Sequence, residues 1–114
     1  MSAPVSIILY PTSDIAASKA LFTRLLGVEP AQDAPYYVGF EVGGMTLGLD
    51  PTGEERGMVG ATPFFEVADI NASLAEMKAA GADVAEDPRV VGPGRTVAMV
   101  SDPDGNMIGL VQNS

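Results

Sequence analysis

A short segment occurs twice in this chain: Asp14-Ile-Ala-Ala-Ser18 recurs as Asp69-Ile-Asn-Ala-Ser73. The two copies are 69 − 14 = 55 residues apart, close to half of the 114-residue length. Each copy follows a short apolar stretch, residues 5–10 in one case and 61–67 in the other, and each opens a segment with helical spacing of apolar residues. The repeat predicts two copies of one strand-then-helix unit, so the fold has to accommodate an internal duplication.

Both repeated segments carry signals for the start and the end of a helix. Ser13 or Asp14, and Asp69 in the second copy, can accept hydrogen bonds from the free amides of a first helical turn. Gly27 and Gly81 follow the last apolar positions, where glycine tolerates the left-handed conformation that ends a helix. We expect each helix to cover a sheet with one apolar face, formed by Ile15, Phe22, Leu25 and Leu26 in the first copy and by Ile70, Leu74 and Met77 in the second.

Extended segments follow each predicted helix, at residues 36–42 and 44–49 in the first half and at 84–91, 96–100 and 107–111 in the second. The last two are joined by residues 102–106, Asp-Pro-Asp-Gly-Asn, which predict a hairpin turn. Residues 51–60 are rich in glycine and proline, as linkers are. The sequence therefore predicts a single α+β domain of two βαβββ modules, module 1 at about 1–50 and module 2 at about 61–114, joined by a linker at 51–60.

Composition limits the functions that are open to this domain. With 46% hydrophobic and 18% charged residues the chain is typical of a packed globule. Its net charge of −9 disfavours nucleic acid and anionic membranes as partners; it would attract cationic small molecules, or serve only to keep the protein in solution. The absence of cysteine and histidine excludes disulfides, thiolate nucleophiles and the commonest metal ligand.

The amino-terminal segment gives no sign of export. Residues 1–4 contain no basic residue, and the apolar run at 5–9 is much shorter than a signal core or a membrane span. We expect a cytoplasmic protein.

Taken in order, these segments resemble the vicinal oxygen chelate superfamily, which includes glyoxalases, bleomycin-resistance proteins and ring-cleaving dioxygenases. The resemblance spans nearly the whole chain, and its most specific pieces are residues 13–18, residues 25–28 (Leu-Leu-Gly-Val) and residues 102–106. It implies that each module rolls its sheet into a half-barrel and that curved mixed sheets enclose a cleft for a substrate or drug.

Enzymes of this superfamily hold a metal ion in the cleft, with ligands on the first and last strands of each module. The corresponding positions here are Ile7, Gly48, Thr62 and Gly109, and a shift of one residue in either direction finds no better ligands. The resemblance therefore implies a member without the metal site, and we expect no metal and no cofactor. The glycines either widen the cleft or allow close packing against a neighbouring chain.

Alternation along the strands extends the predicted cleft from these four positions. It is lined by Ile7, Leu9, Thr46, Gly48, Asp50, Thr62, Phe64, Glu66, Met107, Gly109 and Val111, with Tyr37 and Arg95 as further candidates. Of the adjacent pair at 64 and 65, Phe64 is expected in the cleft and Phe65 in the core. Glu66 is a candidate catalytic base, or else an exposed or arginine-paired carboxylate.

Two functions follow from the resemblance. The first is a metal-free homodimer, similar to the bleomycin-resistance proteins, that binds an apolar or cationic small molecule such as an antibiotic in its cleft. The alternative is a glyoxalase-like lyase or isomerase that works without metal, or with an oxygen-only site built from carboxylates such as Asp50 and Glu66. The sequence leaves open whether the two modules pair within one chain or are exchanged between chains.

Overall fold

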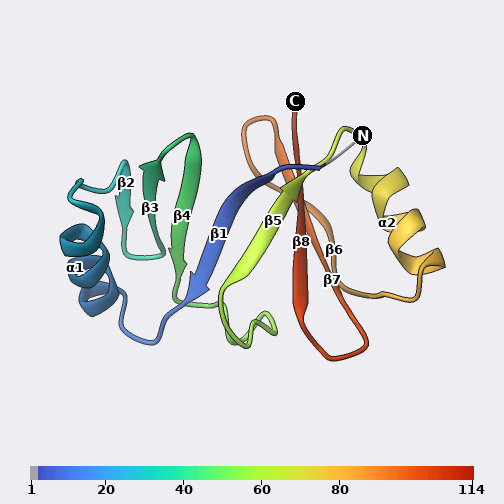
Figure 1. Cartoon of the computed structure of the whole chain (residues 1–114), viewed down its shortest axis with the longest axis horizontal. Helices are drawn as coiled ribbons and strands as arrows, with labels where there is room; N and C mark the ends of the chain where they lie inside the picture. The colour runs from blue at the N-terminus through green and yellow to red at the C-terminus, as the bar shows by residue number, and fades with distance from the viewer. Residues whose placement is uncertain (1–2) are drawn as a thin grey trace.

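The computed structural model describes residues 3–114 and contains one mixed eight-stranded sheet and two helices (Figure 1). The prediction that the chain carries no export signal used residues 1–9, and of these residues 1 and 2 lie outside the described residues. Along the sheet the strand order is β2-β3-β4-β1-β5-β8-β7-β6. The predicted α+β fold of two βαβββ modules is confirmed.

Each module supplies one half of the sheet and one helix. The first consists of β1 (Val5–Pro11), α1 (Ile15–Leu26), β2 (Gln32–Ala34), β3 (Tyr37–Val42) and β4 (Met45–Asp50). The second consists of β5 (Thr62–Glu66), α2 (Ile70–Ala79), β6 (Asp83–Gly92), β7 (Arg95–Ser101) and β8 (Met107–Asn113).

The two modules join at the centre of the sheet, where β1 and β5 run antiparallel. In this pair Ile7 lies opposite Phe64 and Leu9 opposite Thr62. Each central strand also pairs in parallel with the last strand of its own module, so that Leu9 lies beside Gly48 and Phe64 beside Gly109. The modules are therefore paired within one chain, and the two glycines occupy equivalent places in the duplicated sheet.

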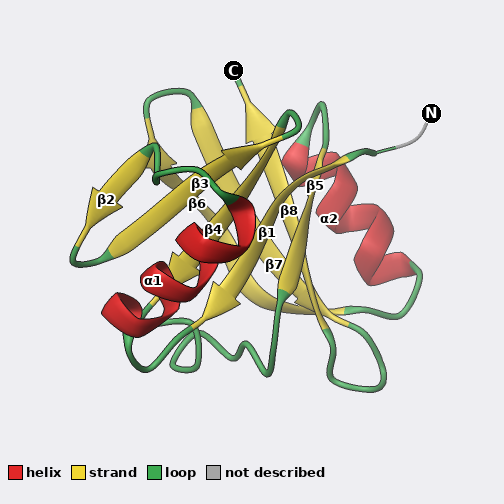
Figure 2. Ribbon diagram, turned by 60° about the vertical axis from the view of Figure 1, so that its left-hand side comes forward, coloured by secondary structure: helices red, strands yellow, loops and turns green. Residues whose placement is uncertain are grey.

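Both helices begin at the predicted aspartates. The side chain of Asp14 accepts a hydrogen bond from the Ala17 amide at 3.0 Å, and Asp69 accepts from the amides of the first turn of α2. Helix α1 ends at Gly27, whose φ of 71° is the left-handed conformation that the sequence suggested. Helix α1 packs on β3 and β4, whereas α2 packs on β6, β7 and β8, so the helices lie at the two ends of the sheet (Figure 1). Figure 2 shows α1 from the front, over its own half of the sheet.

One predicted helix contact is wrong. Leu25 is 73% exposed, because α1 turns only Ile15, Phe22 and Leu26 toward the sheet. The apolar face predicted for α2 is confirmed, with Ile70 and Leu74 buried and Met77 packed against them.

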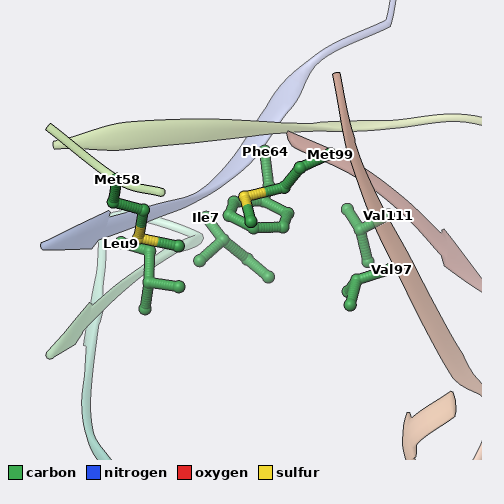
Figure 3. Close-up of a cluster of buried hydrophobic side chains, with 7 residues drawn as sticks. All are labelled: Ile7, Leu9, Met58, Phe64, Val97, Met99 and Val111. Carbon is green, nitrogen blue, oxygen red and sulfur yellow. The ribbon is translucent and has the colours of Figure 1, made fainter. Parts of the chain in front are cut away.

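Three apolar clusters hold the fold together. One lies under α1 around Val38, Phe40 and Leu49, and a second lies under α2. The third lies on the other face of the sheet, which carries no helix and is called the inner face below; it contains Ile7, Leu9, Met58, Phe64, Val97, Met99 and Val111 (Figure 3). Met58 reaches this cluster from the linker, so the linker covers part of the inner face.

Within residues 3–114 no helix is both long and apolar enough to cross a membrane.

Candidate functional site

A cavity of about 980 Å³ opens on the inner face, and its lining comes from both modules. Four side chains of the inner cluster, Ile7, Leu9, Phe64 and Val97, form its apolar floor. Small-molecule sites in proteins are cavities of roughly 300 to 1,000 Å³ with apolar walls and a few polar groups. This inner cavity has the size and the floor of such a site.

The space at Gly109 is filled by an aromatic ring. A Cβ atom at this position would lie 2.4 Å from Cγ of Phe64, the neighbour of Gly109 in the parallel β5–β8 pair. Carbon atoms in contact normally keep about 3.5 to 4.0 Å apart. The glycine is therefore required by the ring that lies over it.

The equivalent Gly48 is covered from two sides. A Cβ atom there would lie 2.7 Å from the Tyr37 hydroxyl oxygen and 2.8 Å from Cδ1 of Leu9. The Tyr37 ring also covers Gly39, the cross-strand partner of Gly48. The prediction that two glycines widen the cleft is wrong, because aromatic side chains of the same chain occupy the space that the glycines leave.

The residues at the superfamily's metal positions do not fit a divalent ion. Ile7 is apolar, the two glycines have no donor, and Thr62 is 1% exposed with its hydroxyl donating to the Gly60 carbonyl at 3.2 Å. No group of three or more acidic side chains close enough to hold a metal occurs among residues 3–114, a stretch without histidine or cysteine. The donor set is therefore wrong for the hard or borderline ions that these enzymes use.

An ion-pair network borders the cavity. The Arg56 guanidinium, from the linker, donates to Asp50 at 2.5 Å and makes two hydrogen bonds to Glu86, of 2.9 and 3.0 Å. The second oxygen of Asp50 accepts from the amide and the hydroxyl of Thr52, both at 2.8 Å. Asp50 belongs to module 1 and Glu86 to module 2, so Arg56 ties the two modules and the linker together.

The ion-pair network shifts the pKa values of Arg56 and Glu86. Burial works against ionisation of Glu86, but the hydrogen bonds and charge of Arg56, with a contribution from Arg89, hold the pKa of Glu86 below its ordinary value. Burial also disfavours the charge on Arg56, yet Glu86 and Asp50 outweigh it and raise the pKa of Arg56. Arg56 and Glu86 therefore stabilise each other's charged forms. Asp50 is engaged by Arg56 and Thr52, so its carboxylate is not available to a metal ion or to a cationic ligand.

Half of the basic residues of the chain line the inner cavity. The sequence contains six, and Arg56, Arg89 and Arg95 are among the lining side chains. Tyr37 lies near Arg95: burial raises the pKa of the Tyr37 hydroxyl, and the charge of Arg95 partly opposes this rise. The cavity thus gathers half of the cations of the chain, two of which are paired with Asp50 and Glu86.

Six of the thirteen predicted cleft residues line the cavity: Ile7, Leu9, Tyr37, Asp50, Phe64 and Arg95. The other seven were also predicted to line the cleft, but the structure places them elsewhere. Gly48 and Gly109 lie under side chains, Val111 is buried in the inner cluster, and the Thr46 hydroxyl donates to Glu41 at 2.7 Å.

The remaining three, Thr62, Glu66 and Met107, line a second cavity, of about 870 Å³, between β5, β8 and α2. Phe65, expected in the core, is only half-buried and borders this outer groove. Glu66 lies at the end of β5, where its carboxylate accepts a hydrogen bond from the Asn113 amide at 3.0 Å. The structure does not bring Asp50 and Glu66 together in one cavity.

Many residues at the rim of the inner cavity were not predicted from the sequence. Gln32 and Tyr36, Thr52 and Arg56, the β6–β7 hairpin at residues 89–94, and Asn113 with Ser114 all line the inner cavity. Most of these belong to loops or strand ends, where alternation gives no direction. One sequence signal could have pointed to the rim: the chain has only six basic residues, so each of the arginines at 56, 89 and 95 was a candidate for a specific role.

Comparisons with known proteins agree with this architecture. The sequence model of the Glyoxalase/Bleomycin resistance protein/Dioxygenase superfamily matches residues 5–110. A superfamily member from Vibrio splendidus 12B01 is similar in structure, with a TM-score of 0.69 and 22% identity over 99% of this chain and 100% of that one. No curated protein matches the chain in sequence.

Other similar structures carry different activities in their names. Methylmalonyl-CoA epimerase from Streptomyces coelicolor, in complex with 2-nitronate-propionyl-CoA, has a TM-score of 0.77 and 19% identity over 100% of this chain and 99% of that one. A Legionella pneumophila structure named NAD-dependent benzaldehyde dehydrogenase has a TM-score of 0.74 and 18% identity over 95% and 98%. At such identities the likeness shows the fold alone. With its duplicated modules and a family match over almost its whole length, the chain belongs to the glyoxalase/bleomycin resistance protein/dioxygenase superfamily.

Proposed function

We propose that this protein binds an apolar small molecule in the inner cavity and does so without a metal ion. The observation that carries the proposal is the pair of aromatic side chains at the superfamily's metal positions: Phe64 fills the space at Gly109, and Tyr37 fills the space at Gly48. What remains of the cleft is a cavity with an apolar floor and a polar rim, which suits binding better than metal-assisted chemistry.

The lining also bears on the charge of the ligand. A cationic ligand was one expectation from the net charge of −9. In the inner cavity, however, three arginines face the space, and the carboxylate of Asp50 is engaged by Arg56. Arg56 and Arg89 are paired with carboxylates, but Arg95 makes no ion pair among residues 3–114, and its charge disfavours a cationic ligand. A neutral or anionic apolar molecule, an antibiotic of that kind included, is compatible with the cavity.

Metal-free lyase or isomerase chemistry has less support. A general base has to reach the reacting atom from within the cavity. The carboxylate of Glu66 is hydrogen-bonded to Asn113 at the border of the outer groove, and that of Asp50 is held by Arg56 and Thr52. Neither carboxylate is placed as a free base, so we favour binding over catalysis.

A single-tryptophan reporter tests the proposal, because the chain contains no tryptophan. Tyr36 lines the cavity and is 76% exposed, so Tyr36→Trp puts a fluorophore at the rim with little effect on packing. Leu25→Trp on α1 is the matched control, exposed to a similar extent but outside the cavity. Both variants would be titrated with neutral and anionic aromatic compounds and with glycopeptide, enediyne, mitomycin and quinone-type antibiotics.

We expect saturable fluorescence changes for Tyr36→Trp with at least one class, none for Leu25→Trp, and no effect of a chelator. A uniformly flat response from Tyr36→Trp would overturn the binding proposal. Binding that appears only after a divalent metal is added would overturn its metal-free part.

A further inference from the structure

Ion pairs leave one cation of the inner cavity without a carboxylate. Arg56 is paired with Asp50 and Glu86, and Arg89 contacts Glu86 at 3.3 Å. Arg95 makes no ion pair with any residue of the described chain, 3–114. Of the three arginines at the cavity, Arg95 is therefore the one that has no carboxylate of residues 3–114 within ion-pair distance.

The position of Arg95 is fixed by its strand and by one hydrogen bond. It is the first residue of β7, and Val97, two residues further along, belongs to the inner cluster, so alternation turns Arg95 to the inner face as well. Its Nε atom donates to the Asn113 side-chain oxygen at 3.1 Å on the neighbouring β8. Among residues 3–114 the two terminal nitrogens of the guanidinium have no hydrogen-bond partner.

Tyr37 belongs to the other module and lines the same cavity as Arg95. Its ring lies against Gly48 and packs on the inner cluster. The charge of Arg95 acts on the Tyr37 hydroxyl more strongly than either of the opposing charges of Glu41 and Asp50. This hydroxyl has no hydrogen-bond partner among the described residues. A hydroxyl donor and a guanidinium with two free nitrogens thus lie beside an apolar floor.

We propose that Arg95 and Tyr37 form a binding subsite for a carboxylate, and that the ligand of the inner cavity is an apolar molecule carrying one such group. The guanidinium presents its two terminal nitrogens to both carboxylate oxygens, and the Tyr37 hydroxyl donates to one of them. The apolar body lies on Ile7, Leu9 and Phe64. This subsite rests on the proposed function, since it specifies the ligand of the same cavity.

Glu66, the carboxylate that is linked to Arg95 through Asn113, does not take the place of the ligand. Glu66 accepts from the Asn113 amide nitrogen, while the Asn113 oxygen accepts from Arg95. Asn113 therefore stands between the two charges, and it orients the guanidinium through Nε with the terminal nitrogens left open. Asn113 therefore holds the Arg95 guanidinium in place before an anion binds, and such preorganisation favours anion binding.

Calorimetric titration with a matched pair of ligands tests the subsite. 2-Naphthoate and 2-naphthamide share one ring system and differ in charge. For the wild-type protein we expect 2-naphthoate to bind about tenfold more tightly than 2-naphthamide. Arg95→Gln should weaken 2-naphthoate about tenfold and change 2-naphthamide by less than about twofold, and Tyr37→Phe should weaken 2-naphthoate about threefold.

Arg24→Gln is the control, because it removes the same charge from the last turn of α1, outside the cavity. It should leave both affinities unchanged. If Arg95→Gln fails to fold by circular dichroism, Arg95→Lys replaces it, and loss of the paired nitrogens should still weaken 2-naphthoate several-fold.

The outcomes separate the two proposals. Equal binding of both ligands, with no effect of Arg95→Gln, would overturn the carboxylate subsite and leave the binding cavity intact. Equal losses in Arg95→Gln and Arg24→Gln would overturn the subsite in favour of a general charge effect. Absence of binding by either ligand to the wild-type protein would overturn the subsite and count against the proposed function as well.

Discussion

Substitution of Gly109 by alanine tests whether the Phe64 ring occupies the former metal position. The added Cβ would lie 2.4 Å from Cγ and Cδ2 of Phe64 and 2.6 Å from Cδ1, so the ring has to move by about 1 Å to restore a normal contact. Phe64 is only 2% exposed and is surrounded by the inner cluster, which leaves it little room.

Such overpacking costs about 1 to 3 kcal/mol, and the short contacts with three ring atoms place Gly109→Ala at the upper end. We expect the free energy of unfolding to fall by about 3 kcal/mol and Tm by about 12 °C for a domain of this size. Gly48→Ala should cost less, about 1 kcal/mol, because the Tyr37 hydroxyl end that it meets is only partly buried and can move. Gly60→Ala, with no atom within 4 Å of the new Cβ and no positive φ, should be neutral or slightly stabilising.

Urea denaturation followed by circular dichroism measures these differences. Phe64→Leu combined with Gly109→Ala completes a double-mutant cycle, in which the double variant should be at least about 1 kcal/mol more stable than the two single effects would give by addition. Equal stability of Gly109→Ala and Gly60→Ala would show that the space at position 109 is open and that the Phe64 ring does not occupy it.

Three further predictions concern the ion-pair network and the assembly. Arg56→Met removes the main partner of the Asp50 and Glu86 carboxylates, which have little exposure. Urea denaturation should show that the free energy of unfolding falls by about 3 kcal/mol, against less than about 0.5 kcal/mol for Arg24→Met at an exposed position. Equal stability of the two variants would contradict a stabilising role of the network. The pKa of Glu86 is lower in the folded chain than its ordinary 4.5, so its contribution to stability is present above that value and lost as the pH falls below it; the unfolding free energy of the wild type should therefore decrease more steeply than that of Glu86→Gln between about pH 5 and pH 3, and parallel curves would refute this. Finally, we propose that the protein forms a homodimer, because the edge strands β2 and β6 leave unpaired backbone groups that a second chain can cover; native mass spectrometry should detect the dimer at micromolar concentration, and monomer alone would contradict it.

Much of the fold could be predicted because the duplication leaves its marks in local sequence. Caps at Asp14 and Asp69, and glycine after the first helix, act within one turn of chain and need no tertiary knowledge. Alternation also identified the floor of the cavity at Ile7 and Phe64. Leu25 shows the limit of this reasoning: helical spacing predicts an apolar face, but the way α1 docks on the sheet decides which of its residues are covered.

The content of the cleft could not be predicted in the same way. Alternation assigns Gly48 and Gly109 to the inner face, but it does not say that the ring of Tyr37 extends over the first or that Phe64 lies on the second. The net charge of −9 gives no information about location either: Arg95 and two other arginines line one cavity of a chain that is acidic as a whole. Both errors arise from properties that depend on side chains brought together from different strands.

The most direct test of a metal-free cavity for an apolar carboxylate is an experimental structure of the protein with 2-naphthoate bound. We predict that the carboxylate lies within hydrogen-bond distance of the Arg95 guanidinium and the Tyr37 hydroxyl, and that the Phe64 ring stays over Gly109. A ligand or a metal ion seated at Gly48 and Gly109, with both aromatic rings turned away, would contradict the account.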